Sequence, residues 1–173
     1  MLEFLSEGSL ALHMEYVRRL RLKYSILEKS VKEIKSKNLY DILRQKIKIT
    51  DKTDALNLIS EIVLHDVFFS SFRDEECMAS QEARRHFGSE SALLYSLYRQ
   101  GMKLRFGFVC VYCREDKIWT RSSENMIDLV VPTEPTLAVD VCEHSYFCDF
   151  GFDKERYLLS ALSHLDLSRL EKK

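Results

Sequence analysis

Glycine and proline are scarce in this sequence, with five and two residues among 173. Disordered, collagen-like and linker-dominated chains contain far more of both, so the composition excludes these classes. Charged residues make up 31% of the chain and apolar residues 46%. A folded chain of this length buries roughly two-thirds of its unfolded surface. We therefore expect a globular protein with one domain, or with two subdomains that share one core.

An excess of charge of one sign is also missing, because 26 basic and 27 acidic side chains give a net charge of -1. Proteins whose main partner is nucleic acid or an anionic membrane carry a basic surplus, so we expect neither partner. The basic stretch over residues 18–48 also contains acidic residues. This mixture favours a solvated helix flank over a nucleic-acid patch.

Long apolar runs are absent as well. No segment reaches the 18 or more residues of a membrane span, and residues 1–7 lack the basic start and apolar stretch of a signal peptide. The five cysteines are an odd number and are scattered through apolar segments. This usage is typical of packing thiols in a reducing compartment, so we expect a cytoplasmic protein without disulfides.

Two of these cysteines, Cys110 and Cys113, have the spacing of half a zinc or redox site. Residues three apart on a strand face opposite sides, and no second cysteine pair follows at zinc-ribbon spacing. The pattern therefore favours packing over metal binding at this pair.

The first half of the chain has helical periodicity. Apolar residues recur at three- and four-residue steps over residues 9–48, and again over residues 55–72 after a polar break. The two segments predict a long helical hairpin, which we assign to an N-terminal domain over residues 1–80.

The second half mixes helices with strands. A helical pattern covers residues 81–98, and Gly101 is expected to end it as a C-terminal glycine does. Three segments with strand composition follow at residues 103–113, 118–120 and 136–141, and helical spacing returns over residues 157–170. We predict an α/β chain of the α+β type, whose C-terminal domain over residues 81–173 has a three-stranded antiparallel sheet flanked by helices.

The segment from Asp140 to His144 is the most informative short motif. A carboxylate and an imidazole lie four residues apart at the end of an apolar strand. A turn after the strand can bring both to one metal ion, and such ligands suit iron, manganese or zinc. The alternative is an aspartate that caps the turn beside a surface histidine.

Two further histidines, His13 and His65, lie among apolar residues. Each alone is typical of a core histidine, but together they can supply the missing ligands.

Three motifs in chain order carry a resemblance to a known family. Residues 9–13 read Ser-Leu-Ala-Leu-His, residues 64–69 read Leu-His-Asp-Val-Phe-Phe, and residues 140–147 read Asp-Val-Cys-Glu-His-Ser-Tyr-Phe. The last keeps five positions of the signature Asp-Val-Trp-Glu-His-Ala-Tyr-Tyr. In these motifs the chain resembles the iron/manganese superoxide dismutase family across nearly its whole length.

The resemblance implies one iron or manganese ion per chain and superoxide as the substrate. It also implies that superoxide is converted to dioxygen and hydrogen peroxide. The implied metal ligands are His13, His65, Asp140 and His144.

The sequence departs from the family pattern beside this site. Arg21 stands where the family has a tyrosine that guards the substrate channel, and Glu61 stands at one of the two places that supply a bridging glutamine. We hypothesise that Arg21 and Glu61 form an ion pair next to the metal and act in catalysis. The alternative is that Glu61 points outward to a neighbouring basic residue and does not approach the metal.

The resemblance also implies a homodimer. Val17 and Phe147 occupy the places of a polar pair that bridges the family interface, so we expect a dry contact there. Glu143, which in the family reaches the partner's ligand histidine, is retained.

These features leave three functions open. The first is dismutation of superoxide, which would make the chain an oxidoreductase. The second is a catalytically inactive protein that keeps the fold as an interaction or structural module. The third is different oxygen or peroxide chemistry with another small oxidant at the same metal. The positions of Arg21 and Glu61 are expected to discriminate among them.

Overall fold

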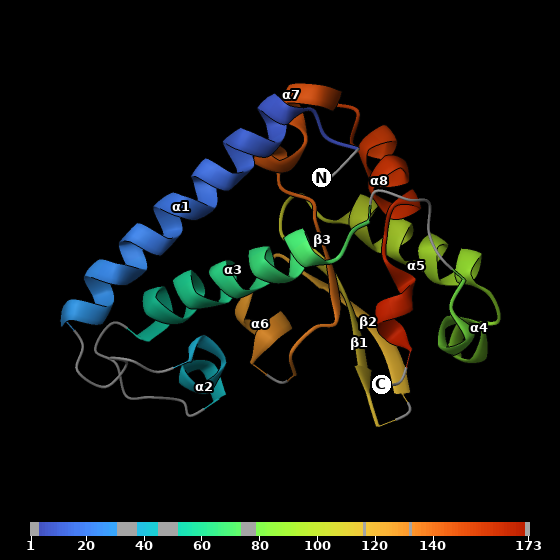
Figure 1. The fold of residues 1–173 in the computed structure, drawn as a ribbon, viewed down its shortest axis with the longest axis horizontal. Helices are drawn as coiled ribbons and strands as arrows, with labels where there is room; N and C mark the ends of the chain where they lie inside the picture. Colours follow the sequence, from blue (N-terminus) through green and yellow to red (C-terminus); the bar gives the residue numbers. More distant parts are fainter. Residues whose placement is uncertain are drawn as a thin grey trace.

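The computed structural model describes residues 4–30, 38–44, 52–73, 79–115, 117–131 and 133–171. A three-stranded sheet lies between a helical hairpin and a group of C-terminal helices (Figure 1). This arrangement confirms the predicted α+β class. The buried apolar side chains form one cluster that draws on both halves of the chain, while the proposed division after residue 80 stays a prediction.

The hairpin consists of α1 (Glu7–Ser30) and α3 (Lys52–Ser70), with the short helix α2 (Leu39–Arg44) between them. The inner face of α1 buries Ser9, His13, Val17 and Leu20, which recur at the spacing of one helical face.

The single helical pattern predicted over residues 9–48 is too long. Within that range the described residues form two helices, and residues 31–37 and 45–51 lie outside the description.

The second half begins with α4 (Gln81–Phe87) and α5 (Glu90–Lys103), where we predicted one helix. Gly88 ends α4 in the left-handed conformation, at φ 83°, and the side chain of Ser89 accepts a hydrogen bond from the backbone of Ala92 to begin α5. Gly101 does not end α5, contrary to our prediction. A Cβ atom there would lie 3.0 Å from a methyl group of Leu158 in α8 (Lys154–Ser163), so glycine permits close packing of α5 on α8.

The sheet has the order β2-β1-β3, and both pairings are antiparallel. Its strands are β1 (Phe108–Arg114), β2 (Lys117–Ser123) and β3 (Leu137–Asp140), near the predicted positions. Strand β1 begins five residues later than predicted because residues up to Lys103 remain helical. The register places Phe108 opposite Asp140, so β3 ends beside the first residue of the central strand.

The remaining elements are short and follow the sheet. They are α6 (Ile127–Val130), the 3-10 helix η2 (Glu143–Ser145), α7 (Phe147–Phe150), α8 (Lys154–Ser163) and η3 (Leu167–Leu170). Helix α3 packs on β3, and η2 packs on α1. These two contacts bring the end of the sheet to the inner face of the hairpin.

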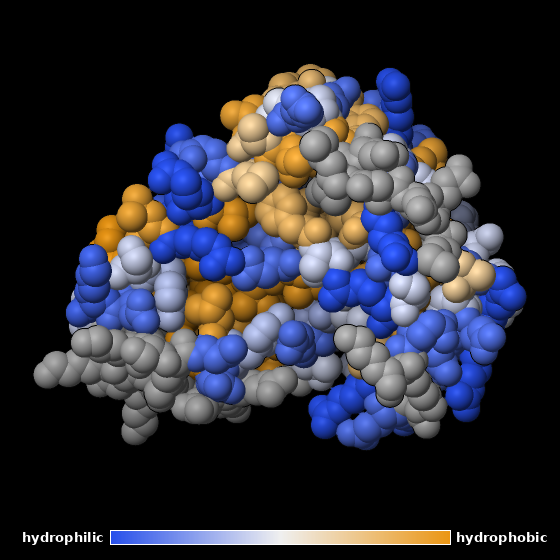
Figure 2. Space-filling model, in the orientation of Figure 1, coloured by the Kyte–Doolittle hydropathy of each residue, from blue (hydrophilic) through white to orange (hydrophobic). Residues whose placement is uncertain are grey.

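The outer surface of α1 is partly apolar. Figure 2 shows hydrophobic side chains at the surface along this helix, and its exposed apolar residues include Leu12, Leu22 and Ile26. None of the described helices combines the length and the hydrophobicity needed to cross a membrane.

Candidate metal centre

Four side chains from four elements converge in the interior. Their possible ligand atoms all lie within 4.8 Å of one another. In the described ranges this is the one group of three or more histidine, cysteine or acidic side chains that converges in this way. It is named the His3Asp cluster here, and its members are those implied by the resemblance: His13 of α1, His65 of α3, Asp140 of β3 and His144 of η2.

The Oδ2 atom of Asp140 is the centre of the cluster. The Nε2 atoms of His13 and His65 each lie 3.4 Å from it, and Nε2 of His144 lies 3.1 Å from it. Nε2 of His65 and Nε2 of His144 are 3.3 Å apart. Neighbouring ligands that each lie about 2 Å from one transition-metal ion have separations of this size.

Backbone and hydroxyl groups fix Asp140 at the end of β3. Its Oδ1 accepts a hydrogen bond of 2.8 Å from the backbone N–H of Cys142, and its Oδ2 accepts one of 2.6 Å from the hydroxyl of Ser145. The sequence left open whether Asp140 caps the following turn or faces a metal. In the structure Oδ1 of Asp140 caps the following turn, and Oδ2 faces three imidazoles.

His65 is oriented by its own helix. Its Nδ1 donates a hydrogen bond of 2.7 Å to the backbone carbonyl of Glu61, one turn earlier in α3. The other ring nitrogen, Nε2, therefore points into the cluster with its lone pair available, as in many metal-binding histidines.

Burial and neighbouring side chains together set the protonation of His13 and Asp140. Burial lowers the pKa of His13, which favours the neutral imidazole that binds metals. Burial alone would raise the pKa of Asp140, but the three imidazoles around its carboxylate outweigh burial and hold this pKa well below its usual range. The cluster therefore presents one carboxylate charge among imidazoles.

His13 provides the clearest sign that the cluster fits a cation. Its side chain is fully buried, and neither ring nitrogen has a hydrogen-bond partner of acceptable geometry among the described residues. An unsatisfied buried polar group costs about 1–3 kcal/mol. A metal ion bound by Nε2 would remove that cost, and three imidazole nitrogens with one carboxylate oxygen suit iron, manganese or zinc.

Aromatic rings enclose the cluster on its inner side. The ring of His13 lies 4.9 Å from Phe68 and 5.0 Å from Phe69, and the ring of His65 meets Phe108 edge-on at 5.2 Å. These apolar neighbours keep water from the buried ligands and strengthen electrostatic interactions among them.

His144 lies at the open side of the cluster. Its side chain is 29% exposed, whereas those of the other three members are fully buried. Two surface pockets reach it, of about 620 Å³ and about 460 Å³, and Tyr16 and Glu143 line both. Small molecules from solvent therefore reach the cluster past His144.

Tyr16 is the residue at this site that sequence reasoning missed. Its ring stacks on His144 with 4.2 Å between ring centroids and 28° between planes, and its hydroxyl donates a hydrogen bond to the carboxylate of Glu61. Burial and this hydrogen bond raise the pKa of Tyr16, so the phenol keeps its proton. The position of Tyr16, one helical turn after His13, was the signal that could have identified it.

The predicted ion pair between Arg21 and Glu61 is not the arrangement found. Arg21 pairs with Asp66, and both of these side chains are about half exposed. An ion pair at the surface avoids the desolvation cost of the buried pair that we expected. Glu61 lies at the mouth of the cluster, as predicted, but its partner is Tyr16.

The residues expected at a dimer interface differ in exposure. Val17 is 6% exposed and packs within its own chain, which leaves little of its side chain for a partner. Glu143 is exposed, and Phe147 is 45% exposed. The last two border the smaller pocket beside His144.

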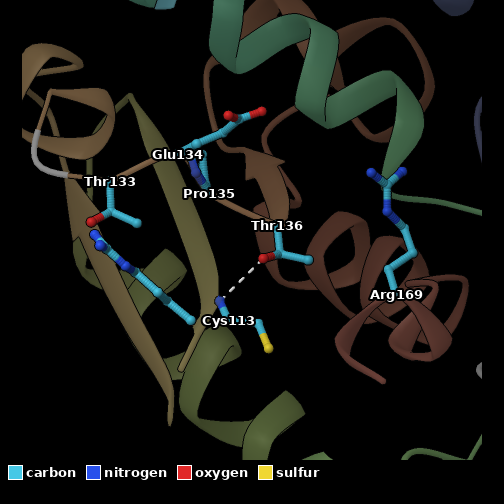
Figure 3. Close-up of a pocket in the computed structure, with 7 residues that line it drawn as sticks. Cys113, Thr133, Glu134, Pro135, Thr136 and Arg169 are labelled. Atoms are coloured by element: carbon cyan, nitrogen blue, oxygen red, sulfur yellow. Dashed lines mark hydrogen bonds between the residues drawn. The ribbon is translucent and has the colours of Figure 1, made fainter. Parts of the chain in front are cut away.

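The cysteine pair at positions 110 and 113 lies away from the cluster. Cys110 is buried, while Cys113 lines a polar surface pocket of about 700 Å³ (Figure 3). Its backbone N–H donates to the hydroxyl of Thr136 over 3.1 Å. Cys110, Cys142 and Cys148 are free thiols, and Cys77 lies outside the described residues.

Comparison with known families gives an independent result. The model of the C-terminal domain of iron/manganese superoxide dismutases matches residues 75–173. This range contains Asp140 and His144, whereas His13 and His65 precede it. No curated protein matches the chain at a significant level. Because the match covers more than half of the chain, this protein belongs to the iron/manganese superoxide dismutase family.

Proposed function

We propose that the His3Asp cluster binds one iron or manganese ion per chain and that the protein dismutates superoxide. The observation that carries this proposal is the convergence of three Nε2 atoms on Oδ2 of Asp140. The family match supports the same metals and substrate.

The residues of the chain have separate tasks in this proposal. When bound, iron or manganese supplies the one-electron chemistry by which two superoxide anions and two protons give dioxygen and hydrogen peroxide. Asp140 offsets part of the ion's charge, while Cys142 and Ser145 hold its carboxylate in place. The carbonyl of Glu61 fixes the ring of His65 through Nδ1.

Acidic residues at the mouth favour a second candidate. Glu61 and Glu143 line the larger pocket beside His144 together with Arg105, whose guanidinium lies 3.7 Å from the carboxylate of Glu124. Two carboxylates oppose the approach of an anion such as superoxide but not of a neutral oxidant. Peroxide chemistry at the same metal is therefore the alternative, and a metal that serves only the structure is the outcome if neither oxidant reacts.

We also propose that two copies of the chain associate through the surface beside His144. Exposed Phe147 and Leu12, together with Glu143, line the smaller pocket there. The odd number of cysteines and their scatter through apolar segments support our proposal of a reducing, cytoplasmic location.

One experiment tests the function. Metal content and removal of superoxide and of hydrogen peroxide are measured on natively purified wild type, on His144→Ala and on His86→Ala. His86 is a histidine outside the cluster and serves as the control. We expect nearly one iron or manganese per chain and superoxide removal in wild type and in the control, and loss of both in His144→Ala.

The other outcomes separate the alternatives. Peroxide removal without superoxide removal selects the second candidate. Bound metal without either activity indicates a structural site. Absence of iron and manganese after reconstitution would contradict the proposed metal site itself.

A further inference from the structure

The His3Asp cluster is exposed to solvent on one side, at His144. Three of its members are fully buried, so exchange of a bound ion or of a small ligand passes His144, which is 29% exposed. His144 belongs to a three-residue 3-10 helix, and such a short element holds a ring less firmly than α1 or α3 does. Some other group has to fix this ring for the site to persist.

Tyr16 covers the exposed ligand. Its ring stacks on His144 and also lies 5.6 Å from the ring of His65. Because Tyr16 and His144 line both surface pockets, the tyrosine stands between the two openings to the cluster. A stacked ring in this place limits rotation of the imidazole about its side-chain bonds.

Glu61 fixes the tyrosine in turn. The phenol of Tyr16 on α1 donates to the carboxylate of Glu61 on α3, so the hydrogen bond also ties the two hairpin helices together. A carboxylate accepts a stronger hydrogen bond than a neutral oxygen does. This explains in physical terms why an acidic residue is useful at position 61.

We propose that Tyr16 and Glu61 form a latch over His144, which holds this ligand in its binding position and slows release of the metal. The inference rests on the proposed metal site. Tyr16 and Glu61 are positioning residues in this account, because they act on the ion through His144. Arg21 has no part in the latch, since it pairs with Asp66.

The test is the rate of metal release from the manganese-loaded protein into excess chelator. Tyr16→Phe keeps the stacked ring but loses the hydrogen bond, and Glu61→Leu removes the acceptor. We expect each variant to release manganese about tenfold faster than wild type, the ratio for one lost hydrogen bond to a charged group. Glu61→Gln keeps an acceptor oxygen, and its rate is expected within about threefold of wild type.

Two controls distinguish a latch from general loosening. Tyr24→Phe alters another tyrosine of α1, whose hydroxyl has no hydrogen-bond partner among the described residues, and its release rate should equal that of wild type. The double variant Tyr16→Phe/Glu61→Leu should release manganese no faster than either single variant, because both changes break the same bond. Thermal unfolding of each metal-free variant checks that the fold is retained.

Failure of the latch and failure of the metal site give different results. If wild type retains manganese while Tyr16→Phe and Glu61→Leu release it at the wild-type rate, the latch is wrong and the metal site stands. Rates that multiply in the double variant would also overturn the latch. If wild type does not retain manganese at all, both proposals are wrong.

Discussion

The two halves of the His3Asp cluster are built in different ways. Asp140 and His144 lie four residues apart at the end of β3, and hydrogen bonds from Cys142 and Ser145 hold the carboxylate even without an ion. His13 and His65 come from separate helices, and His13 has no hydrogen-bond partner in the described part of the chain. At Asp140 the sheet half is thus preorganised, whereas His13 in the helical half depends on packing of the hairpin.

This difference suggests where a substitution changes the fewest contacts of the cluster. The local motif at the end of β3 lies within the range that the family model matches. Two departures from the family pattern, Arg21 and Glu61, lie on the two helices, where one substitution alters a single contact between elements. The predictions below use this contrast, from the largest expected effect to the smallest.

Removal of Asp140 should have the largest effect. In Asp140→Ala the N–H of Cys142 and the hydroxyl of Ser145 lose their acceptor in the interior, and the imidazoles lose the carboxylate that they surround. We expect complete loss of metal and a fall of about 3 kcal/mol in the free energy of unfolding. Metal analysis and urea denaturation measure both quantities.

The isosteric variant sharpens this test. Asp140→Asn retains an oxygen for the backbone of Cys142 but removes the charge, so it should lose metal at a smaller cost in stability. Equal stability of Asp140→Ala and wild type in the metal-free state would show that the sheet half is not preorganised.

Metal loading should have the next largest effect. An ion at about 100 times its dissociation constant stabilises the folded state by about 2.7 kcal/mol. For a chain of this size, this free energy corresponds to a rise of roughly 5–10 °C in the melting temperature. Calorimetry of the loaded and chelated protein measures the shift, and His144→Ala should show none. A comparable shift in His144→Ala would place the ion elsewhere.

Replacement of His13 should change the free energy of unfolding in the direction opposite to removal of Asp140. In the metal-free protein, His13→Leu removes a buried imidazole without partners, so we expect about 1 kcal/mol of added stability together with loss of metal. Urea denaturation of the chelated variant and of chelated wild type gives the difference. A loss of several kcal/mol would mean that His13 is held as firmly as Asp140.

Arg21 should matter least. Its ion pair with Asp66 is about half exposed, and pairs of this kind contribute roughly 0–1 kcal/mol. We expect Arg21→Ala to keep its metal content and its rate of metal release, with a change in stability below about 0.5 kcal/mol. A marked change in the rate of metal release would show that Arg21 influences the bound metal.

The sequence predicted those parts of the molecule that depend on local patterns. The three strands follow from β-rich segments, and the four residues of the His3Asp cluster were assigned from motifs within short stretches of chain. Helix ends were less predictable. Gly101 looks like a terminator from its place after an amphipathic segment, yet it lies within α5, where its missing side chain lets the methyl groups of Leu158 approach closely.

Contacts between elements could not be read from spacing alone. Arg21 and Tyr16 both lie on α1 at distances from His13 that permit a role at the site, and only the packing of α1 on α3 and η2 decides between them. The hydrogen bond from Tyr16 to Glu61 and the pairing of Arg21 with Asp66 are results of that packing. Val17 was assigned to an interface from the family resemblance, and in the structure its own chain buries most of its side chain.

Anomalous X-ray diffraction from crystals of the manganese- or iron-loaded protein tests the central claim most directly. Data on either side of the absorption edge of the metal locate the ion and identify its element. We predict one anomalous peak per chain, within bonding distance of the three Nε2 atoms and of Oδ2 of Asp140. A loaded protein whose anomalous peak lies anywhere else would contradict the assignment of the His3Asp cluster as its metal centre.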